Sequence, residues 1–171
     1  KLDFLIHSIA FAPKEDLQGR VIDSSRGGFL LATEISCYSL IRLIKAFEPL
    51  MKTEGSILTM TYYGSQKAIP KYGIMGPIKA MLESVVKYTA AELGKSKIRV
   101  NAISPGPIAT RAASGITGFD KLLDKCKKNS VLNSPIIIND VGNLAAFLVS
   151  DLSKNIAGTI QYVDCGYQIM G

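Results

Sequence analysis

The apolar residues of this chain fall into short blocks that predict β-strands. Residues 3–11 (DFLIHSIAF) are apolar on both faces and rich in β-branched and aromatic side chains, which is typical of a strand buried in a parallel sheet. Similar blocks begin at Gly55, Ile98 and Thr159. The pattern therefore predicts four strands, spread over the whole chain.

Helical patterns separate the first three predicted strands. A broad apolar stripe after Ser25 predicts a long helix, which we expect to end near Pro49 because the residue before a proline disfavours helical backbone. A second helix is predicted from Pro77, which suits a first turn, to Gly94, which suits a C-terminal cap. Residues 13–20 are polar and predict a loop.

Two further helices are predicted before the last strand. Residues 119–128 form a short lysine-rich segment, and Asn139 or Asp140 can cap a helix that continues to Leu152. The order strand, helix, strand, helix, strand, helix, helix, strand predicts an α/β fold with a parallel sheet and right-handed crossovers.

The length of 171 residues suits one domain, and no repeat or linker divides it. A nucleotide-binding α/β domain carries a Gly-rich turn after its first strand, but no G-x-G-x-x-G follows residues 3–11. Either this is a different α/β protein, or the first half of the sheet precedes Lys1. The abrupt start of the chain in an apolar strand favours the second interpretation, in which residues 1–171 are the C-terminal, catalytic portion of a single Rossmann-like doubly wound domain. Its first strands and Gly-rich turn would precede Lys1.

Composition narrows the function. Hydrophobic residues make up 47% of the chain and charged residues 20%, an ordinary globular mixture. The net charge is +6, but basic residues are not interleaved with aromatic ones and tryptophan is absent, so we expect no nucleic acid partner. We also expect no membrane partner, since no apolar run looks long enough to cross a bilayer.

The cysteines and the histidine argue against a metal site. Cys37, Cys126 and Cys165 are scattered, no C-x-x-C occurs, and His7 is the single histidine. This pattern suggests a reducing compartment. We expect His7 to be a packed, hydrogen-bonded residue rather than a catalytic one.

Three residues suggest a reductase. Tyr62 and Tyr72 stand ten positions apart, and Lys79 follows seven positions after Tyr72, where a strand ends and a helix begins. A tyrosine hydroxyl can stabilise or protonate an oxyanion, and a nearby lysine can hold a cofactor hydroxyl and favour tyrosine ionisation. If Pro77 starts the helix, Tyr72 lies in the preceding loop.

Ordered motifs carry a resemblance to a known family. They are I6-H-S-I-A-F-A-P, T61-Y-Y-G-S-x-K-A-I-P-x-Y-x-x-M-G-x-x-K79, I98-R-V-N-A-I-S-x-G-P-I-x-T110, A112-A-S-G-I116 and Y162-V-D-x-G-Y167. With these motifs the chain resembles the enoyl-acyl-carrier-protein reductases of bacterial fatty-acid synthesis. That family is a divergent branch of the short-chain dehydrogenase/reductases.

The resemblance implies roles for individual residues. Tyr72 would stabilise the enolate oxygen of a thioester, Lys79 would hold the nicotinamide ribose, and Tyr62 would lie beside the acyl chain. The implied cofactor, NADH with NADPH not excluded, would be bound by Ser8, Ile9, Lys79, Gly106, Ile108 and Thr110. The implied substrate-binding residues are Ala10, Tyr62, Met75, Ala112, Ile116 and Phe119.

The resemblance also implies partners. The substrate would be an enoyl thioester on acyl carrier protein, and lysines of residues 119–128 could meet that acidic carrier, although a solvated helix face explains them too. A cytoplasmic homotetramer is implied. Two alternatives stay open: a short-chain reductase acting on a carbonyl, and a member of the fold without catalytic activity.

Overall fold

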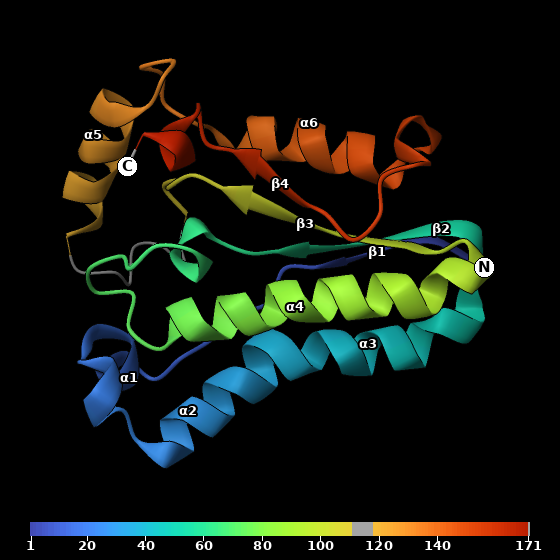
Figure 1. Cartoon of the computed structure of the whole chain (residues 1–171), viewed down its shortest axis with the longest axis horizontal. Helices are drawn as coiled ribbons and strands as arrows, with labels where there is room; N and C mark the ends of the chain where they lie inside the picture. The colour runs from blue at the N-terminus through green and yellow to red at the C-terminus, as the bar shows by residue number, and fades with distance from the viewer. Residues whose placement is uncertain (111–117, 171) are drawn as a thin grey trace.

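A computed structural model describes residues 1–110 and 118–170, which form a parallel four-stranded sheet with the strand order β1-β2-β3-β4 (Figure 1). The strands are β1 (Leu2–His7), β2 (Met51–Met60), β3 (Arg99–Pro105) and β4 (Ile160–Val163). The helices are α1 (Lys14–Gln18), α2 (Arg26–Thr33), α3 (Ser39–Phe47), α4 (Met75–Leu93), α5 (Phe119–Asn129) and α6 (Ile138–Val149). The expected Rossmann-like α/β architecture is confirmed.

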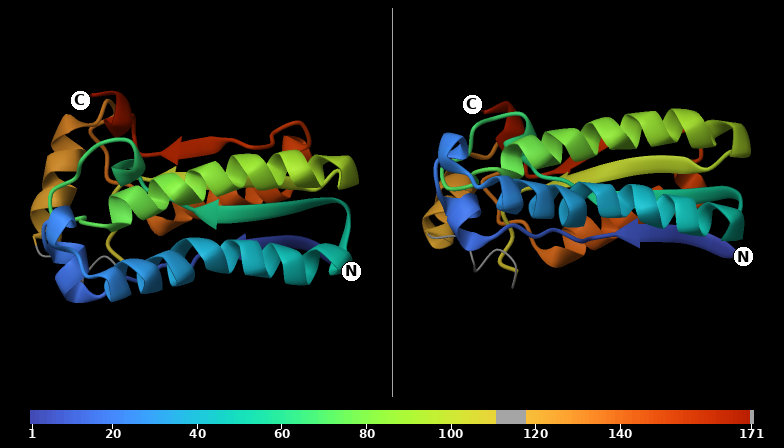
Figure 2. Two further views of the ribbon diagram at one scale, coloured as in Figure 1. Left: turned by 60° about the horizontal axis from the view of Figure 1, so that its bottom comes forward. Right: turned by 90° about the horizontal axis from the view of Figure 1, so that it is seen from below.

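Helices cover both faces of the sheet, and each face has its own core (Figures 1 and 2). Neighbouring residues of a strand point to opposite faces. Ile57, Val100 and Ala102 therefore pack with the apolar sides of α2, α3 and α4. Leu58 and Ile103 pack with Leu148 of α6 on the other face.

This arrangement corrects the expectation that every crossover is right-handed. The chain steps in one direction across the sheet from β2 to β3 and from β3 to β4. The first step crosses the face that α4 covers, and the second crosses the face that α6 covers. The two crossovers therefore have opposite hands, which the order of elements in the sequence cannot reveal.

The long helix predicted after Ser25 is a composite. Ser25 caps α2 by accepting a hydrogen bond from the Gly28 amide at 2.9 Å. A π-helical turn, Glu34–Tyr38, then joins α2 to α3. Within it, the Ser36 hydroxyl accepts a hydrogen bond from the Phe11 amide at 2.9 Å and donates one to the Phe11 carbonyl at 3.0 Å. The turn therefore holds the segment that follows β1.

By length and composition, the helical stretch Arg26–Leu50 could cross a membrane, with a mean hydropathy of 1.3 over its most apolar window. This finding corrects the expectation that no apolar run is long enough. In the structure, Ala32, Leu40 and Ile44 of this stretch belong to the core beneath the sheet. A core helix passes the same test of length and composition.

Several element boundaries differ from the sequence prediction. The first strand ends at His7 rather than at residue 11, and residues 13–20 contain the short helix α1 instead of only a loop. Helix α4 begins at Met75, so Pro77 stands within its first turn. A proline is tolerated there because amides of the first turn have no helical acceptor. Tyr72 still lies in the preceding loop.

Buried polar groups fix the far end of α6. The Arg99 guanidinium donates hydrogen bonds to the Leu148 carbonyl and the Ser153 hydroxyl at 2.8 Å each, and to the Ser150 carbonyl at 3.2 Å. These acceptors lie at or just beyond the C-terminus of α6, where carbonyls have no helical partner. Arg99 therefore ties α6 to the middle of the sheet.

Candidate functional site

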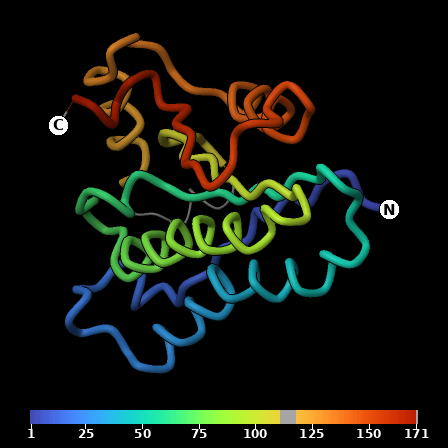
Figure 3. Tube along the Cα trace, turned by 45° about the vertical axis from the view of Figure 1, so that its right-hand side comes forward, coloured from blue at the N-terminus to red at the C-terminus, as the bar shows by residue number. Residues whose placement is uncertain are grey.

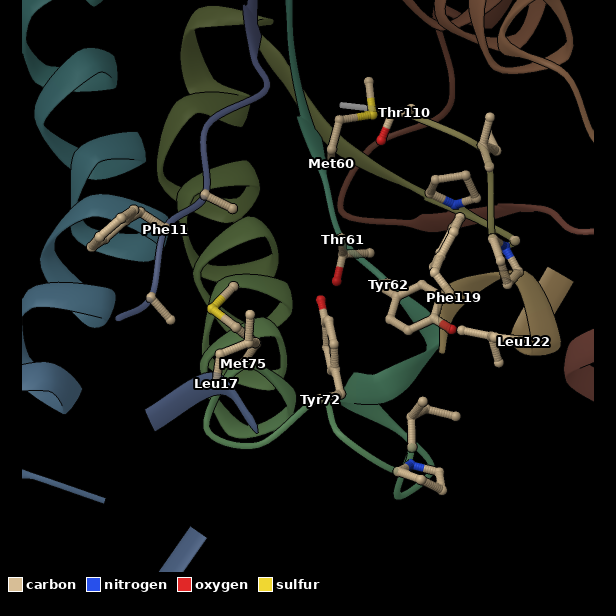
Figure 4. Close-up of a pocket in the computed structure, with 18 residues that line it drawn as sticks. Phe11, Leu17, Met60, Thr61, Tyr62, Tyr72, Met75, Thr110, Phe119 and Leu122 are labelled. Carbon is tan, nitrogen blue, oxygen red and sulfur yellow. The ribbon is translucent and has the colours of Figure 1, made fainter. Parts of the chain in front are cut away.

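A cavity of about 330 Å³ lies beyond the carboxyl ends of the strands (Figure 4). Helices α1 and α5 stand at this same end of the strands, and the N-terminus of the chain lies at the other end (Figures 1 and 3). The lining is mostly apolar and comes from the segments after β1, β2 and β3 and from both helices; it includes Phe11, Leu17, Met60, Met75, Phe119 and Leu122. Such a slot suits an apolar ligand.

Two tyrosines form the polar part of this lining. The rings of Tyr62 and Tyr72 meet edge to face, with centroids 4.9 Å apart and an interplanar angle of 67°. The Tyr72 hydroxyl points along the cavity toward Thr61 (Figure 4). The Tyr62 hydroxyl is buried and has no hydrogen-bond partner within the described ranges 1–110 and 118–170. A buried hydroxyl without a partner is unfavourable, so the Tyr62 hydroxyl would gain a hydrogen bond from any polar ligand atom that reached it.

Burial keeps both phenols protonated. Desolvation raises the pKa of Tyr62 and of Tyr72 above the ordinary value of 10.0. For Tyr72, desolvation is the dominant effect on the pKa and works against the ionisation that a nearby lysine can favour. At neutral pH, Tyr72 is a hydrogen-bond donor.

Two glycines allow the close packing that positions Tyr72. A Cβ on Gly64 would lie 2.6 Å from the ring of Tyr72, and a Cβ on Gly76 would lie 2.9 Å from the Gly64 carbonyl. Only glycine fits these approaches without displacing a neighbour. The turn Tyr63–Ser65 is thereby packed between Tyr72 and the first turn of α4.

Lys79 is a buried cation on α4, with 5% of its surface exposed, and it does not itself line the cavity. Its Nζ donates a hydrogen bond to the Met60 carbonyl at 2.7 Å, which leaves two of its three protons available. Desolvation lowers the pKa of Lys79 to about 8, opposed by the nearby Cys37 and Glu83. The ammonium can therefore hold an oxygen-rich ligand such as a ribose.

The other predicted residues divide into three groups. The cavity lining includes Ala10, Met75, Gly106, Ile108, Thr110 and Phe119. Ser8 and Ile9 are exposed at the end of β1 and do not line the cavity. The remaining two substrate predictions, Ala112 and Ile116, lie outside the described residues.

His7 has the packed role expected of it. Its Nδ1 lies 2.8 Å from the Thr59 hydroxyl, and its Nε2 lies 2.8 Å from the Ser39 hydroxyl. Both ring nitrogens thus have partners within the fold. Burial lowers the pKa of His7, and the nearby Lys79 charge adds to the effect.

Sequence reasoning missed several lining residues. Phe11 and Met60 stand at or just beyond strand ends, a position that could have marked them. Leu17 comes from α1, whose five residues are too few to show a helical period. Leu122 lies in the lysine-rich segment 119–128, whose charge masks the apolar positions of the helix.

These features define a class: a Rossmann-like α/β protein with a Tyr–Tyr–Lys site at the carboxyl edge of its sheet. The model of the family described as "Enoyl-(Acyl carrier protein) reductase" matches residues 1–168. The chain therefore belongs to the enoyl-(acyl carrier protein) reductase family.

Individual relatives agree with this assignment. The enoyl-[acyl-carrier-protein] reductase [NADH] FabI of Rickettsia typhi is 51% identical over 169 residues, which are 99% of this chain and 65% of the relative. The crystal structure of the Aquifex aeolicus enoyl-[acyl-carrier-protein] reductase (NADH) has a TM-score of 0.95 at 50% identity, covering 99% of this chain and 66% of that one.

A second similar structure contains a nicotinamide cofactor. The Anaplasma phagocytophilum enoyl-(acyl-carrier-protein) reductase in complex with NAD has a TM-score of 0.93 at 46% identity, covering 99% of this chain and 63% of that one. The present chain thus spans just under two thirds of the length of these relatives.

Proposed function

We propose that the full-length protein reduces the trans-2 double bond of enoyl thioesters with NADH. The observation that carries this proposal is the protonated Tyr72 beside Tyr62 at the wall of an apolar cavity, with the buried Lys79 hydrogen-bonded to the carbonyl of Met60, a residue of the same wall. In this proposal, residues 1–171 are the catalytic, C-terminal portion of a single Rossmann-like domain.

Each residue has a chemical role in the proposed reaction. When bound, NADH supplies the hydride that adds to C3 of the enoyl group, and the double-bond electrons move to the thioester oxygen. Tyr72 donates a hydrogen bond to that oxygen as its negative charge develops. A proton taken from water then adds to C2 and restores the thioester carbonyl, so that one hydride and one proton have been added across the double bond. The raised pKa of Tyr72 favours this donor role over a role as a base.

The cofactor side of the site is assigned to residues at the strand ends. Lys79 holds the nicotinamide ribose with its two remaining protons, and Gly106, Ile108 and Thr110 lie along the cavity where the nicotinamide would enter. The exposed residues Ser8 and Ile9 would contact the cofactor from the end of β1. The acyl chain would contact Ala10, Tyr62, Met75 and Phe119, with Ala112 and Ile116 proposed from the motif alone.

The carrier and the assembly belong to the same proposal. Lys121 and Lys125 are exposed on α5, whose residues Phe119 and Leu122 line the cavity. An acidic acyl carrier protein docked on these lysines would present its thioester beside the opening. Lys121→Glu combined with Lys125→Glu should therefore raise KM for the carrier-bound substrate at low salt. A cytoplasmic homotetramer is proposed by likeness to the family.

One assay tests the reaction class. Loss of NADH absorbance is followed with crotonyl-CoA and, separately, with acetoacetyl-CoA as substrate. We expect turnover with the enoyl thioester alone. It should be greatly reduced in Tyr72→Phe and unchanged in the matched variant Tyr88→Phe, because residue Tyr88 is 73% exposed. Turnover with acetoacetyl-CoA alone would identify a carbonyl reductase, and absence of turnover with either substrate would refute an enzymatic role.

A further inference from the structure

Glu83 is a buried carboxylate that the proposed mechanism does not use. It stands four residues after Lys79 on α4, which places both side chains on one face of the helix, and 8% of its surface is exposed. It has no ion-pair partner in the part of the chain that the structure describes. A buried carboxylate needs compensating hydrogen bonds.

Two hydroxyl groups provide them. Oε1 of Glu83 accepts a hydrogen bond from the Thr61 hydroxyl at 2.7 Å and one from the Ser65 hydroxyl at 2.5 Å. Short bonds from a hydroxyl to a carboxylate are charge-assisted and stronger than neutral ones. Their donors lie on either side of Tyr62, so Glu83 fastens the segment that carries Tyr62 to the helix that carries Lys79.

The segment that Glu83 fastens also shapes the cavity. Thr61, at the start of this segment, lines the cavity. Its amide donates a hydrogen bond to the Ile103 carbonyl at 2.8 Å. Gly64, within the same turn, lies so near the ring of Tyr72 that an added Cβ would come within 2.6 Å of it. A change at Glu83 would therefore move both tyrosines.

Glu83 is also the acidic group near the Lys79 ammonium. The titratable groups that face Lys79 are His7 from β1, Cys37 from the π-helical turn and Glu83 from α4 itself. The pKa of His7 is lowered and that of Cys37 is raised, so both are neutral at pH 7. Tyr162 of β4, which faces Glu83, also has a raised pKa and is neutral.

We propose that Glu83 is a positioning residue of this site, which fixes the Tyr62 segment through Thr61 and Ser65 and supplies the counter-charge for the Lys79 ammonium. This inference rests on the proposed function, because it assigns Glu83 to the same site. Glu83 acts through Lys79 and the tyrosines and does not touch the substrate.

The test separates the charge of Glu83 from its hydrogen bonds. In the full-length protein, Glu83→Gln removes the charge and keeps an acceptor for both hydroxyls, while Ser65→Ala removes one hydrogen bond and keeps the charge. Glu92→Gln is the matched control, because Glu92 is exposed on the same helix. The titration of Lys79 is followed by ¹³C NMR of protein labelled at lysine Cε, with Lys79→Met assigning the resonance.

We expect Glu83→Gln to lower the Lys79 titration midpoint by about one pH unit, as loss of a nearby opposite charge does. Lys79 would then be about one tenth protonated at pH 8 instead of about half, and NADH affinity at that pH should fall about fivefold. Ser65→Ala should leave the midpoint in place and lower kcat for crotonyl-CoA, and Glu92→Gln should change neither quantity.

The outcomes that overturn the proposal are distinct from failure of the enzyme assignment. An unchanged Lys79 midpoint in Glu83→Gln, with only a lower melting temperature, would reduce Glu83 to a structural residue. If Glu83→Gln does not fold, wild-type kcat in Ser65→Ala refutes the fastening role. The NMR titration needs neither NADH nor thioester, so a moved midpoint in a protein without enoyl turnover would support Glu83 and refute the proposed function alone.

Discussion

Lys79 holds its charge in the protein interior at a free-energy cost, so we predict that Lys79→Met stabilises the cofactor-free, full-length protein. Burial lowers the pKa of Lys79 from 10.5 to about 8. A shift of about 2.5 units corresponds to about 3 kcal/mol against the charged form. The variant loses the hydrogen bond to the Met60 carbonyl, worth about 1 kcal/mol. The expected net gain in free energy of unfolding is about 2 kcal/mol at pH 7.

The gain should depend on pH with a defined sign. Between pH 8 and pH 10.5, the lysine is protonated in the unfolded chain and neutral in the folded protein. The unfolded state binds more protons in this window, so the stability of the wild type rises as the pH increases. Methionine does not titrate, and the advantage of the variant should therefore disappear toward pH 10.5.

Urea denaturation at pH 7 and at pH 9.5 measures both effects. Lys87→Met is the control, since Lys87 is exposed on the same helix and should show no comparable gain. NADH affinity, measured by fluorescence, should fall sharply in Lys79→Met alone. The reasoning would be refuted if Lys79→Met were less stable than the wild type at pH 7. It would also be refuted if the two proteins differed in free energy of unfolding by the same amount at pH 7 and at pH 9.5.

Three further predictions concern packing and proton state. Gly64→Ala should lower kcat for crotonyl-CoA at least tenfold, because its methyl group would displace the Tyr72 ring. Gly94→Ala, where a Cβ meets nothing within 4 Å, is the control, and equal kcat values would contradict the packing argument. Arg99→Leu should lower the free energy of unfolding by about 3 kcal/mol, read by thermal denaturation, because three hydrogen bonds from a charged donor to the end of α6 are lost together. A melting temperature equal to that of the wild type would show that Arg99 is dispensable. The raised pKa of Tyr72 predicts that kcat does not decline between pH 7 and pH 9 through ionisation of this phenol. A decline of kcat in the wild type that is absent in Tyr72→Phe would show that the phenol ionises in this range and would contradict the raised pKa.

The local order of elements could be predicted because it depends on short-range patterns. Strand and helix periods, together with breakers such as Pro49 and Gly94, locate every strand and helix except the short α1 within a few residues. The position of Tyr72 in a loop also followed from Pro77, although α4 begins slightly earlier at Met75. Tyr62, Tyr72 and Lys79 could be grouped because one continuous segment carries them.

Features that depend on the third dimension could not be predicted. Which face of the sheet α6 covers is decided by packing between distant segments, so the opposite hand of its crossover leaves no local pattern. The pairing of Glu83 with Ser65 is equally hidden, because a glutamate in a helix ordinarily faces solvent. The exposure of Ser8 and Ile9 likewise depends on what packs beside β1.

The π-helical turn Glu34–Tyr38 has a consequence for how this chain can vary. Apart from Cys37, the buried positions recur every four residues through the composite helix, at Gly28, Ala32, Ser36, Leu40 and Ile44. In a regular α-helix, sixteen residues at this spacing would drift by about 160° and turn the last position away from the sheet. The extra residue in the π-helical turn takes back about 100° of that drift. Substitutions along this helix are therefore far easier to tolerate than the loss of one residue, which would rotate α3 out of the core and release the Ser36 contact with Phe11.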